Sequence, residues 1–500
     1  MLPKRLPLFL IGLTLLVQPL HATWSIVCVN LRTREVGVAT ATCLEGVGIR
    51  RLVPVIFVGE GAAAAQSNSD ELFGAMNRRL IYFNFRDQED TPEEILLQLA
   101  AQDPQHQSRQ YGIVNFTGDP VTFTGSEAGA AALGVTGRVG DFLYAIQGNV
   151  LAGDKVVTET EVAFRQTKGD MGQKLMAAMQ AAKSMGGDGR CSCPMGTTTC
   201  GAPPPIFDKS AHVGTFLVAR MGDANGGCNV TNGCAKGEYY MRLGFVGFEE
   251  DPDPVDVIQE RFDFFRSNRI GVPDGNHSTA NGPDSLPADG QTTRTVRVHL
   301  RDIEGDLLSH DDVIFEIETV DGEPSSASVG EVVSDGNGQF HFDVTAGTET
   351  GLDRFAIKAT TNEIRATLFP FLEVESVEPE GLHVEKSRVF ASVDTSLGFV
   401  LHAPEHPTAP FWIAGSLHPC GTRLADALYA SPVLPLLLER SPFFPAAPMQ
   451  LDAGGRGEGQ LELPPELLSS FMGSRIEWTG IVLDGGVPLF TEQVFVDVRP

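Results

Sequence analysis

The chain has 500 residues, with 37 Lys plus Arg against 64 Asp plus Glu and a formal net charge of −27. A surface this acidic repels phosphate backbones and anionic lipid, which excludes nucleic acid and charged membrane surfaces as natural partners. The hydrophobic share of 42% supplies enough material for packed cores, so the acidity does not indicate a disordered chain. A chain of this length predicts roughly two to four domains.

Residues 1–22 have the composition of a secretory signal peptide. Lys4 and Arg5 provide a short positive segment, and the stretch from Leu6 to Val17 is almost wholly apolar. Ala22 is the small residue expected at the end of a leader, so cleavage is predicted between Ala22 and Thr23. No later run is long enough for a transmembrane helix. We therefore expect a mature chain that is secreted, periplasmic or at the cell surface, with no integral membrane segment.

Cleavage at this bond gives Thr23 a free α-amino group. An N-terminal threonine carries a nucleophile and a base in one residue, since an α-amine with a pKa of about 7.7 can take the hydroxyl proton near neutral pH. In an extended strand Thr23 and Ser25 face one way and Trp24 faces the other, so Ser25 is a candidate to assist the nucleophile. The alternative is that Thr23 is only the first residue after the leader and Ser25 is structural.

Strand-like and helix-like segments alternate from Thr23 to about Arg266, which predicts an α+β domain. Apolar runs over 24–29 and 36–41, separated by a polar turn, indicate a hairpin, whose register brings Thr42 and Cys43 near Thr23. Further elements are expected as a helix opening at Thr91, a helix over 171–184, and strands over 112–116, 142–147 and 213–219.

Five of the eight cysteines cluster in two loop-like stretches, and this pattern in an exported protein favours disulfides. A zinc site is the alternative, but the histidines and cysteines lack its usual spacing, so no metal and no other cofactor is expected. Five cysteines cannot all pair with one another, so one is free or bonds elsewhere. Cys43, at the end of the hairpin, either lines the site or is simply a small buried residue, and burial is the favoured interpretation. The clustered residues are Cys191, Cys193, Cys200, Cys228 and Cys234.

The second half of the sequence is all-β in pattern. Residues 268–291 are rich in Gly, Pro, Asn and Asp and are interpreted as a linker. Residues 292–374 alternate apolar and polar positions between regular turns, which predicts an immunoglobulin-like β-sandwich, and 375–500 form a further β-rich domain. The run 431–448 holds five prolines and is expected as a packed loop. Neither β region shows a catalytic set, so both are interpreted as spacers or adhesion modules.

The segments 23–27, 37–39, 59–66, 124–125 and 147–153 together resemble the uncharacterised family DUF1028. That family looks like a branch of the N-terminal nucleophile (Ntn) hydrolases, which place a Thr, Ser or Cys at the mature amino terminus of an αββα sandwich. The resemblance implies this fold for residues 23–267 and implies Thr23 as the nucleophile. The bacterial Ig-like domain and the further β domain then follow.

An amide-cleaving enzyme also needs hydrogen-bond donors for the oxyanion that develops during attack. Uncharged polar residues and glycine amides in Gly- or Ala-rich surroundings are the candidates, although each taken alone is more commonly a turn former. The predicted catalytic residues are Thr23, Ser25 and Asn149, and the predicted substrate-binding residues are Gln66, Asn68, Gly125, Gln147 and Gly148.

The leading interpretation is a secreted Ntn hydrolase that cleaves an amide bond in a peptide or a cell-envelope fragment through Thr23. The alternative is a non-catalytic extracellular binding or adhesion protein that uses the hydrolase fold as a scaffold, because a fold alone does not establish activity. A homo-oligomer and a cell-surface partner for the β domains are further expectations.

Overall fold

The computed structural model describes residues 22–68, 72–87, 90–323 and 326–379, and then the segments 381–384, 388–390, 396–403, 408–418, 449–451, 456–462, 475–484, 487–490 and 494–499. The contacts divide the chain into two compact units that meet between Ser267 and Asn268, where the sequence predicts the linker to begin. The predicted leader before Ala22, the run 431–448 and Cys420 lie outside the described residues.

The first unit holds two antiparallel sheets. The six-stranded sheet has the order β10-β9-β2-β1-β8-β7 and the four-stranded sheet has the order β3-β4-β5-β6. The strands of the larger sheet are β1 (Thr23–Asn30), β2 (Val36–Thr42), β7 (Leu133–Val139), β8 (Phe142–Asn149), β9 (Val213–Ala219) and β10 (Met241–Val246). Those of the smaller sheet are β3 (Pro54–Phe57), β4 (Gly61–Gln66), β5 (Gln110–Asn115) and β6 (Val121–Thr124).

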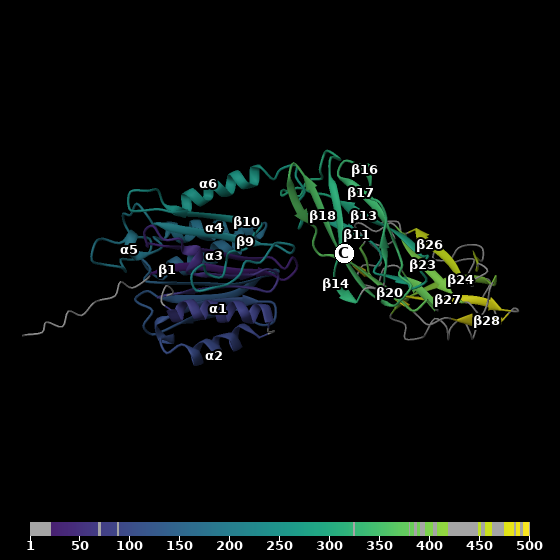
Figure 1. Cartoon of the computed structure of the whole chain (residues 1–500), viewed down its shortest axis with the longest axis horizontal. Helices are drawn as coiled ribbons and strands as arrows, with labels where there is room; N and C mark the ends of the chain where they lie inside the picture. Colours follow the sequence, from purple (N-terminus) through teal and green to yellow (C-terminus); the bar gives the residue numbers. More distant parts are fainter. Residues whose placement is uncertain are drawn as a thin grey trace, which may run out of the picture. The chain divides into compact units, whose positions relative to one another are not determined.

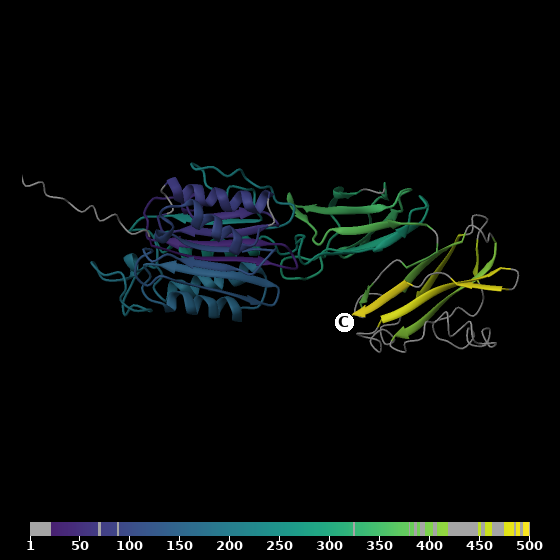
Figure 2. The ribbon, with the colours of Figure 1, turned by 90° about the horizontal axis from the view of Figure 1, so that it is seen from below.

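Helices cover the outer face of each sheet, as both ribbon views show (Figures 1 and 2). The helices are α1 (Leu72–Asp87), α2 (Pro92–Gln102), α3 (Lys155–Gln166), α4 (Met171–Ser184), the short α5 (Gly189–Ser192), α6 (Pro254–Ser267), and the 3-10 turns Ile49–Arg51 and His106–Ser108. Three apolar clusters fill the gaps: one between α1, α2 and the smaller sheet, one between the two sheets, and one between the larger sheet and α3, α4 and α6. The unit therefore has four layers, with the sheets packed together inside.

The predicted alternation along β1 is present in the packing. Trp24 and Ile26 belong to the cluster under α3 and α4, whereas Val27 and Val29 belong to the cluster between the sheets. The side chain of Asn30 accepts backbone N–H groups at the turn and so closes the β1–β2 hairpin locally. The predicted orientation of the first strand is therefore confirmed, with the odd positions of β1 facing the second sheet.

Two helices begin where the sequence provides a capping residue. Thr91 accepts the amide of Glu94 while the Glu94 side chain accepts the amide of Thr91, and Pro92 occupies the first helical position of α2. Asp170 and Gln173 form the same reciprocal pair at the start of α4. The bounds of α4 agree with the prediction over 171–184, because its apolar stripe is a local signal.

The second unit begins with a sandwich of two sheets. One sheet has the order β11-β13-β17-β15 with β16 beside β17, and the other has the order β12-β20-β18-β14 with β19 beside β18. Their apolar side chains share one core. The strands are β11 (Thr279–Asn281), β12 (Ser285–Pro287), β13 (Thr293–His299), β14 (Ile314–Glu323), β15 (Ser328–Val329), β16 (Val333–Gly336), β17 (Gln339–Thr345), β18 (Gly351–Thr361), β19 (Ile364–Thr367) and β20 (Leu372–Val377).

Two short strands lie within residues 268–291, the stretch that the sequence predicts as a linker. Residues 279–281 pair with β13 and residues 285–287 pair in parallel with β20. Leu286 lies in the sandwich core at 1% exposure. Strands of three residues are too short to show an alternating pattern. The Gly and Pro content of the stretch therefore decided the prediction.

The described part of 375–500 is also all-β, as predicted. A three-stranded sheet has the order β21-β23-β26, and a larger one has the order β22-β29-β27-β24-β25 with β28 beside β27. The strands are β21 (Gly381–Val384), β22 (Arg388–Phe390), β23 (Ser396–His402), β24 (Pro410–His418), β25 (Met449–Gln450), β26 (Arg456–Glu462), β27 (Arg475–Asp484), β28 (Val487–Phe490) and β29 (Val494–Arg499). No helix among the described residues has both the length and the apolar character needed to cross a membrane.

Candidate functional site at Thr23

Thr23 lies where three strands of the larger sheet reach one edge. It begins β1, directly opposite Asn149 at the end of β8. Since Trp24 pairs with Ala41, Thr42 at the end of β2 lies on its other side. Thr23 is 3% exposed and Asn149 is fully buried. Antiparallel pairing therefore places two polar side chains, those of Asn149 and Thr42, on either side of Thr23.

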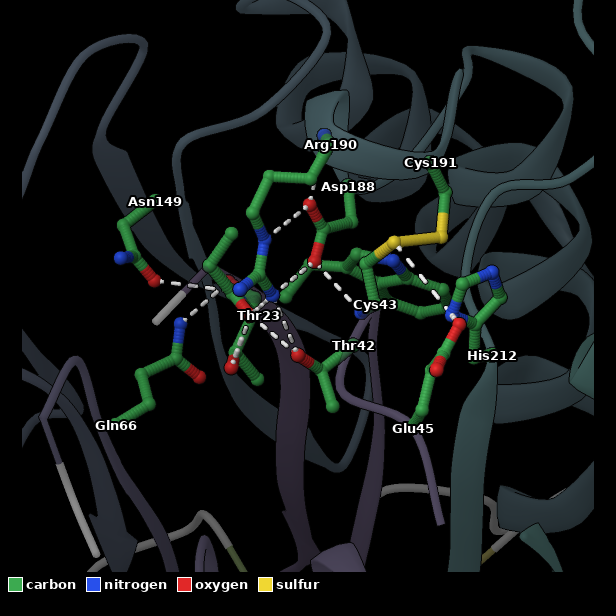
Figure 3. A network of polar contacts seen from close by, with 12 residues as sticks. Thr23, Thr42, Cys43, Glu45, Gln66, Asn149, Asp188, Arg190, Cys191 and His212 are labelled. Carbon is green, nitrogen blue, oxygen red and sulfur yellow. Dashed lines mark hydrogen bonds and ion pairs between the residues drawn. A yellow bond between two sulfur atoms is a disulfide. The ribbon is translucent and has the colours of Figure 1, made fainter. Parts of the chain in front are cut away.

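Every polar group of Thr23 has a partner in this structure (Figure 3). The Thr23 amide donates to Asn149 Oδ1 at 3.1 Å, and the Thr23 hydroxyl donates to the carbonyl oxygen of Ala22 at 2.6 Å. The Thr23 carbonyl accepts from Gln66 Nε2 at 2.8 Å. Two of the predicted site residues, Gln66 and Asn149, thus contact the predicted nucleophile directly.

The carbonyl oxygen of Ala22 is held by more than the Thr23 hydroxyl. It also accepts from Arg190 Nη2 at 3.0 Å and from the Thr42 hydroxyl at 2.5 Å. The Asp188 carboxylate, whose side chain has no exposed surface, pairs with Arg190 Nη2 at 2.8 Å and so fixes the guanidinium. Two hydroxyls and a guanidinium thus donate to one carbonyl oxygen, and donors gathered in this way stabilise negative charge that develops on that oxygen.

A buried polar layer continues from Thr23 into the gap between the sheets. Ser25 Oγ lies 2.5 Å from Gln66 Oε1 and 2.8 Å from Thr40 Oγ1. Gln66 Nε2 also donates to Gln110 Oε1 at 2.8 Å, and Gln110 Nε2 donates to the carbonyl of Gly148 at 2.9 Å. Ser25 therefore contacts Gln66, which in turn contacts Thr23, and the catalytic role assigned to Ser25 stays a prediction.

The other predicted site residues lie farther from the Thr23 hydroxyl. Gly148 is a strand residue paired with Trp24. The Asn68 carbonyl accepts from Arg109 at 2.6 Å, and Asn68 has a positive φ of 57°. A Cβ on Gly125 would lie 2.1 Å from the carbonyl oxygen of Gln107, so close backbone approach requires a glycine there. The roles assigned to these residues stay predictions.

Gln147 is fully buried between the sheets, where a Cβ on Gly112 would lie 2.1 Å from its Oε1. Neither the oxygen nor the nitrogen of the Gln147 side chain has a hydrogen-bond partner among the described residues. A buried amide without partners costs free energy. Its contact with substrate stays a prediction.

Cys43 differs from its interpretation as a simple buried residue, because it forms a disulfide with Cys191 across 148 residues. The Cys43 amide donates to Asp188 Oδ2 at 2.7 Å. The residue after β2 therefore fixes the Asp188 carboxylate, which in turn pairs with Arg190. The preference for disulfides is confirmed, since Cys193–Cys200 and Cys228–Cys234 are also bonded. The fifth clustered cysteine is therefore Cys191, and it bonds outside the cluster.

His212 lies beside this disulfide, with its Nδ1 atom 3.8 Å from Cys43 Sγ and 3.4 Å from Glu45 Oε1. Burial lowers the pKa of His212, and the nearby Glu45 carboxylate partly opposes that shift. Among the residues that the structure describes, Cys43, Cys191 and His212 are the group whose ligand atoms are close enough for a metal ion.

Sequence reasoning missed Gln110 and the roles of Asp188 and Arg190. Gln110 could have been found by placing β4 beside β5, because its strand position matches that of Gln66. The pair Asp188 and Arg190 sits in a short helical turn far along the chain, and no local pattern connects it to Thr23. Thr42, which hairpin register predicts near Thr23, is confirmed there.

The first unit is thus a mixed α/β domain with a buried polar site at the amino end of its first strand. A family model described as "Family of unknown function (DUF1028)" matches residues 23–197. This match agrees with the resemblance found in the sequence. A comparison with curated proteins gave no match.

Solved structures with some likeness include a DUF1028 protein from Silicibacter pomeroyi, 19% identical, which covers 49% of this chain and 85% of its own at a TM-score of 0.35. The Escherichia coli adhesin FdeC is 10% identical, with 96% and 99% covered and a TM-score of 0.20. Invasin, described as a bacterial integrin-binding protein, is 12% identical, with 78% and 56% covered and a TM-score of 0.19. TM-scores of this size carry no argument about the fold or function of this chain.

Proposed function

We propose that the first unit is an Ntn-type hydrolase that cleaves an amide bond through Thr23 after residues 1–22 are removed. The observation that carries this proposal is the position of the Ala22 carbonyl. Its oxygen is contacted by the Thr23 hydroxyl, by Arg190 and by Thr42. A substrate carbonyl that took the place of this one would lie against the Thr23 hydroxyl, with Arg190 and Thr42 as further donors to its oxygen.

The start of the family match supports the same residue. The DUF1028 model begins at residue 23, so the segment that precedes Thr23 lies outside the match. Cleavage at Ala22–Thr23 converts the Thr23 amide into an α-amine, which can act as the general base. Asn149 Oδ1, which accepts from the Thr23 nitrogen, would orient that amine.

The reaction follows from these positions. The Thr23 α-amine takes the proton of the hydroxyl while Oγ1 attacks the amide carbon, and Arg190 and Thr42 stabilise the oxyanion. The protonated amine then gives its proton to the leaving nitrogen, which departs and leaves an ester on Thr23. Water, activated by the same amine, hydrolyses the ester and restores Thr23. No step requires a cofactor.

The compartment and the substrate class belong to the same proposal. Three disulfides in the first unit suit an oxidising environment, which supports export of the mature chain. An exported amide hydrolase meets peptides and fragments of the cell envelope, so an amide of that kind is the proposed substrate.

The test begins with the amino-terminal peptide of the exported protein, identified by mass spectrometry. We expect it to begin at Thr23 with an unblocked amine. A hydroxyl-directed acylating probe, such as a β-lactone, should then label Thr23 in the mature chain, and Thr23→Ala should lower labelling at least about a thousandfold. Thr23→Ser is the matched control that should keep labelling.

Two results would contradict the proposal. One is a mature chain that begins elsewhere, because Thr23 would then lack its base. The other is equal labelling of the Thr23→Ala variant with correct processing. Either result favours the non-catalytic binding or adhesion protein, in which the first unit serves only as a scaffold.

A further inference from the structure

A second cluster of reactive side chains lies next to the Thr23 network. The ligand atoms of Cys43, Cys191 and His212 all lie within 4.8 Å of one another. The Glu45 carboxylate reaches the same place, with Oε1 at 3.4 Å from His212 Nδ1. Figure 3 shows the His212 ring lying against the disulfide with the Glu45 carboxylate directed at it. The proposed hydrolase mechanism uses none of these four side chains.

Two thiolates, an imidazole and a carboxylate are ligands that Zn²⁺ accepts in a tetrahedral site. With Zn–S near about 2.3 Å and Zn–N near about 2.0 Å, a tetrahedral site separates its sulfur and nitrogen atoms by roughly 3.5 Å. The observed distance of 3.8 Å between Cys43 Sγ and His212 Nδ1 is close to that sulfur-to-nitrogen separation. The oxidised pair is the part that does not fit, because its two sulfurs are bonded to each other.

We propose that reduction of the Cys43–Cys191 disulfide converts this cluster into a zinc-class metal site with Cys43, Cys191, His212 and Glu45 as ligands. A dithiol reductant supplies two electrons and two protons, becomes a disulfide itself, and leaves two cysteine thiols. The divalent metal ion then binds both sulfurs and releases the two thiol protons. The histidine and the carboxylate complete the coordination.

The metal would replace one cross-link by another between the same two segments. Cys43 follows β2, and Cys191 lies in α5 beside Arg190. The Cys43 amide holds Asp188, and Asp188 holds Arg190. Reduction alone removes the covalent link and leaves only hydrogen bonds between the two segments, whereas metal binding after reduction cross-links them again. The metal site does not depend on catalysis by Thr23, so it can be tested whether or not the hydrolase proposal holds.

The experiment uses Co²⁺ as a spectroscopic probe on the full mature chain. Cys193, Cys200, Cys228 and Cys234 are replaced by Ser, which keeps Cys43 and Cys191 as the pair under test. After reduction with a metal-free phosphine, we expect one equivalent of Co²⁺ to give thiolate-to-metal absorption. The oxidised protein should give none. Circular dichroism of each sample checks that it is folded.

Two further variants make the assignment specific. Adding His212→Ala should weaken Co²⁺ binding at least about tenfold, since a ligand loss costs no less than the loss of an outer-shell partner. The matched control instead replaces Cys43 and Cys191 by Ser and keeps the other two pairs, and it should show no stoichiometric binding. Absence of absorption in the first protein, or equal affinity without His212, overturns the proposal.

A measurement on the unchanged chain covers the case in which the variants fail to fold. The chain is equilibrated in a dithiol redox buffer, and alkylation with peptide mass spectrometry gives the reduced fraction of Cys43 and Cys191. Free Zn²⁺ at about one hundred times its dissociation constant should shift that equilibrium about a hundredfold toward the dithiol. This corresponds to about 59 mV for a two-electron couple. An unchanged midpoint for this pair contradicts the metal site.

Discussion

The gap between the two sheets of the first unit has two ends that differ in chemistry, although the same strands build both. At one end the facing positions of β1 are Thr23 and Ser25, and at the other they are Val27 and Val29. The neighbouring strands change in step. Thr42 and Thr40 on β2 give way to Val38 and Val36, and Asn149 and Gln147 on β8 give way to Ala145 and Leu143.

Hydrogen bonds and cross-links hold the polar end, and apolar packing holds the other. A polar layer between sheets contributes little hydrophobic stabilisation, and each unmet hydrogen bond in it costs free energy. The apolar end carries the cluster that includes Ile56, Val114 and Leu217. The apolar end shows that these strands can pack an apolar core between the sheets, and the proposed function assigns the active site to the polar end. Four measurements test this comparison, from the largest expected effect to the smallest.

The first change removes the cation of the polar end. Arg190→Gln should lower the rate of Thr23 acylation by about a hundredfold to a thousandfold, because one of the two oxyanion donors is lost. The rate of labelling by the β-lactone probe measures this. Arg165→Gln, an exposed position paired with Glu161, is the matched control and should react as the parent does. Equal acylation rates for the two variants would contradict the proposal that Arg190 stabilises the oxyanion at the polar end.

The second change creates a cavity at the apolar end. Leu217→Ala should lower the unfolding free energy of the first unit by about 3 kcal/mol, since Leu217 is fully buried between the sheets. Hydrogen exchange of first-unit peptides in urea measures the loss separately from the second unit. Leu97→Ala, at a side chain 64% exposed, should change stability by less than about 0.5 kcal/mol. If Leu217→Ala lowered the unfolding free energy by less than about 1 kcal/mol, apolar packing at this end would not be a main source of stability for the first unit.

The third test changes the pH and follows the titration of Asp223, which comes after β9 at the end of the strands opposite Thr23. Burial raises the pKa of Asp223 to about 6, although its carboxylate accepts the amides of Arg220 and Tyr240. The folded state therefore favours the protonated acid. Its stabilising contribution is complete below about pH 4 and is lost as the pH rises through about 6. Unfolding of first-unit peptides, followed by hydrogen exchange at both pH values, measures the loss.

Asp223→Asn serves as the reference, because an amide oxygen keeps the acceptor without titrating. Relative to that variant, the parent should lose about 2 kcal/mol between pH 4 and pH 7. The rate of Thr23 acylation should show no inflection attributable to Asp223, since this residue lies at the other edge of the sheet. Parallel stability curves for the two proteins would show that Asp223 has an ordinary pKa.

The fourth change makes the polar end more apolar at a position away from the nucleophile. Gln147→Met should raise the unfolding free energy by about 1 kcal/mol, because the buried Gln147 amide has no partner among the described residues. Gln147→Glu has a similar shape and should instead destabilise, since it places a carboxyl group in the same space. A destabilising Gln147→Met would indicate that the amide makes a hydrogen bond in solution.

Much of the first unit could be predicted from the sequence because its signals are local. Alternation indicated the two faces of β1, the hairpin register placed Thr42 beside Thr23, and the apolar stripe within 171–184 predicted α4. The polar residues Gln66 and Asn149 were selected from their Gly- and Ala-rich surroundings, and both contact Thr23.

What escaped prediction depends on contacts between distant segments. The pairing of Cys43 with Cys191 and the contact of Arg190 with Ala22 each join residues more than a hundred positions apart. Neither the periodicity nor the residue spacing of the sequence predicts these two contacts, because they form only after the sheets and α5 have packed together. The strands β11 and β12 were missed for the opposite reason, since three residues are too few to establish a period.

The Cys43–Cys191 bond has a consequence for how the protein is made. As the chain emerges from its amino end, Cys28 and Cys43 appear together, while Cys191 follows 148 residues after Cys43. An oxidant acting on the growing chain therefore meets the wrong pair first. In the finished fold Cys28 is a buried free thiol, so any early Cys28–Cys43 bond must be exchanged before β1 can pack against its helices. The Cys191 thiolate can make this exchange by attacking Cys43, which releases the Cys28 thiol.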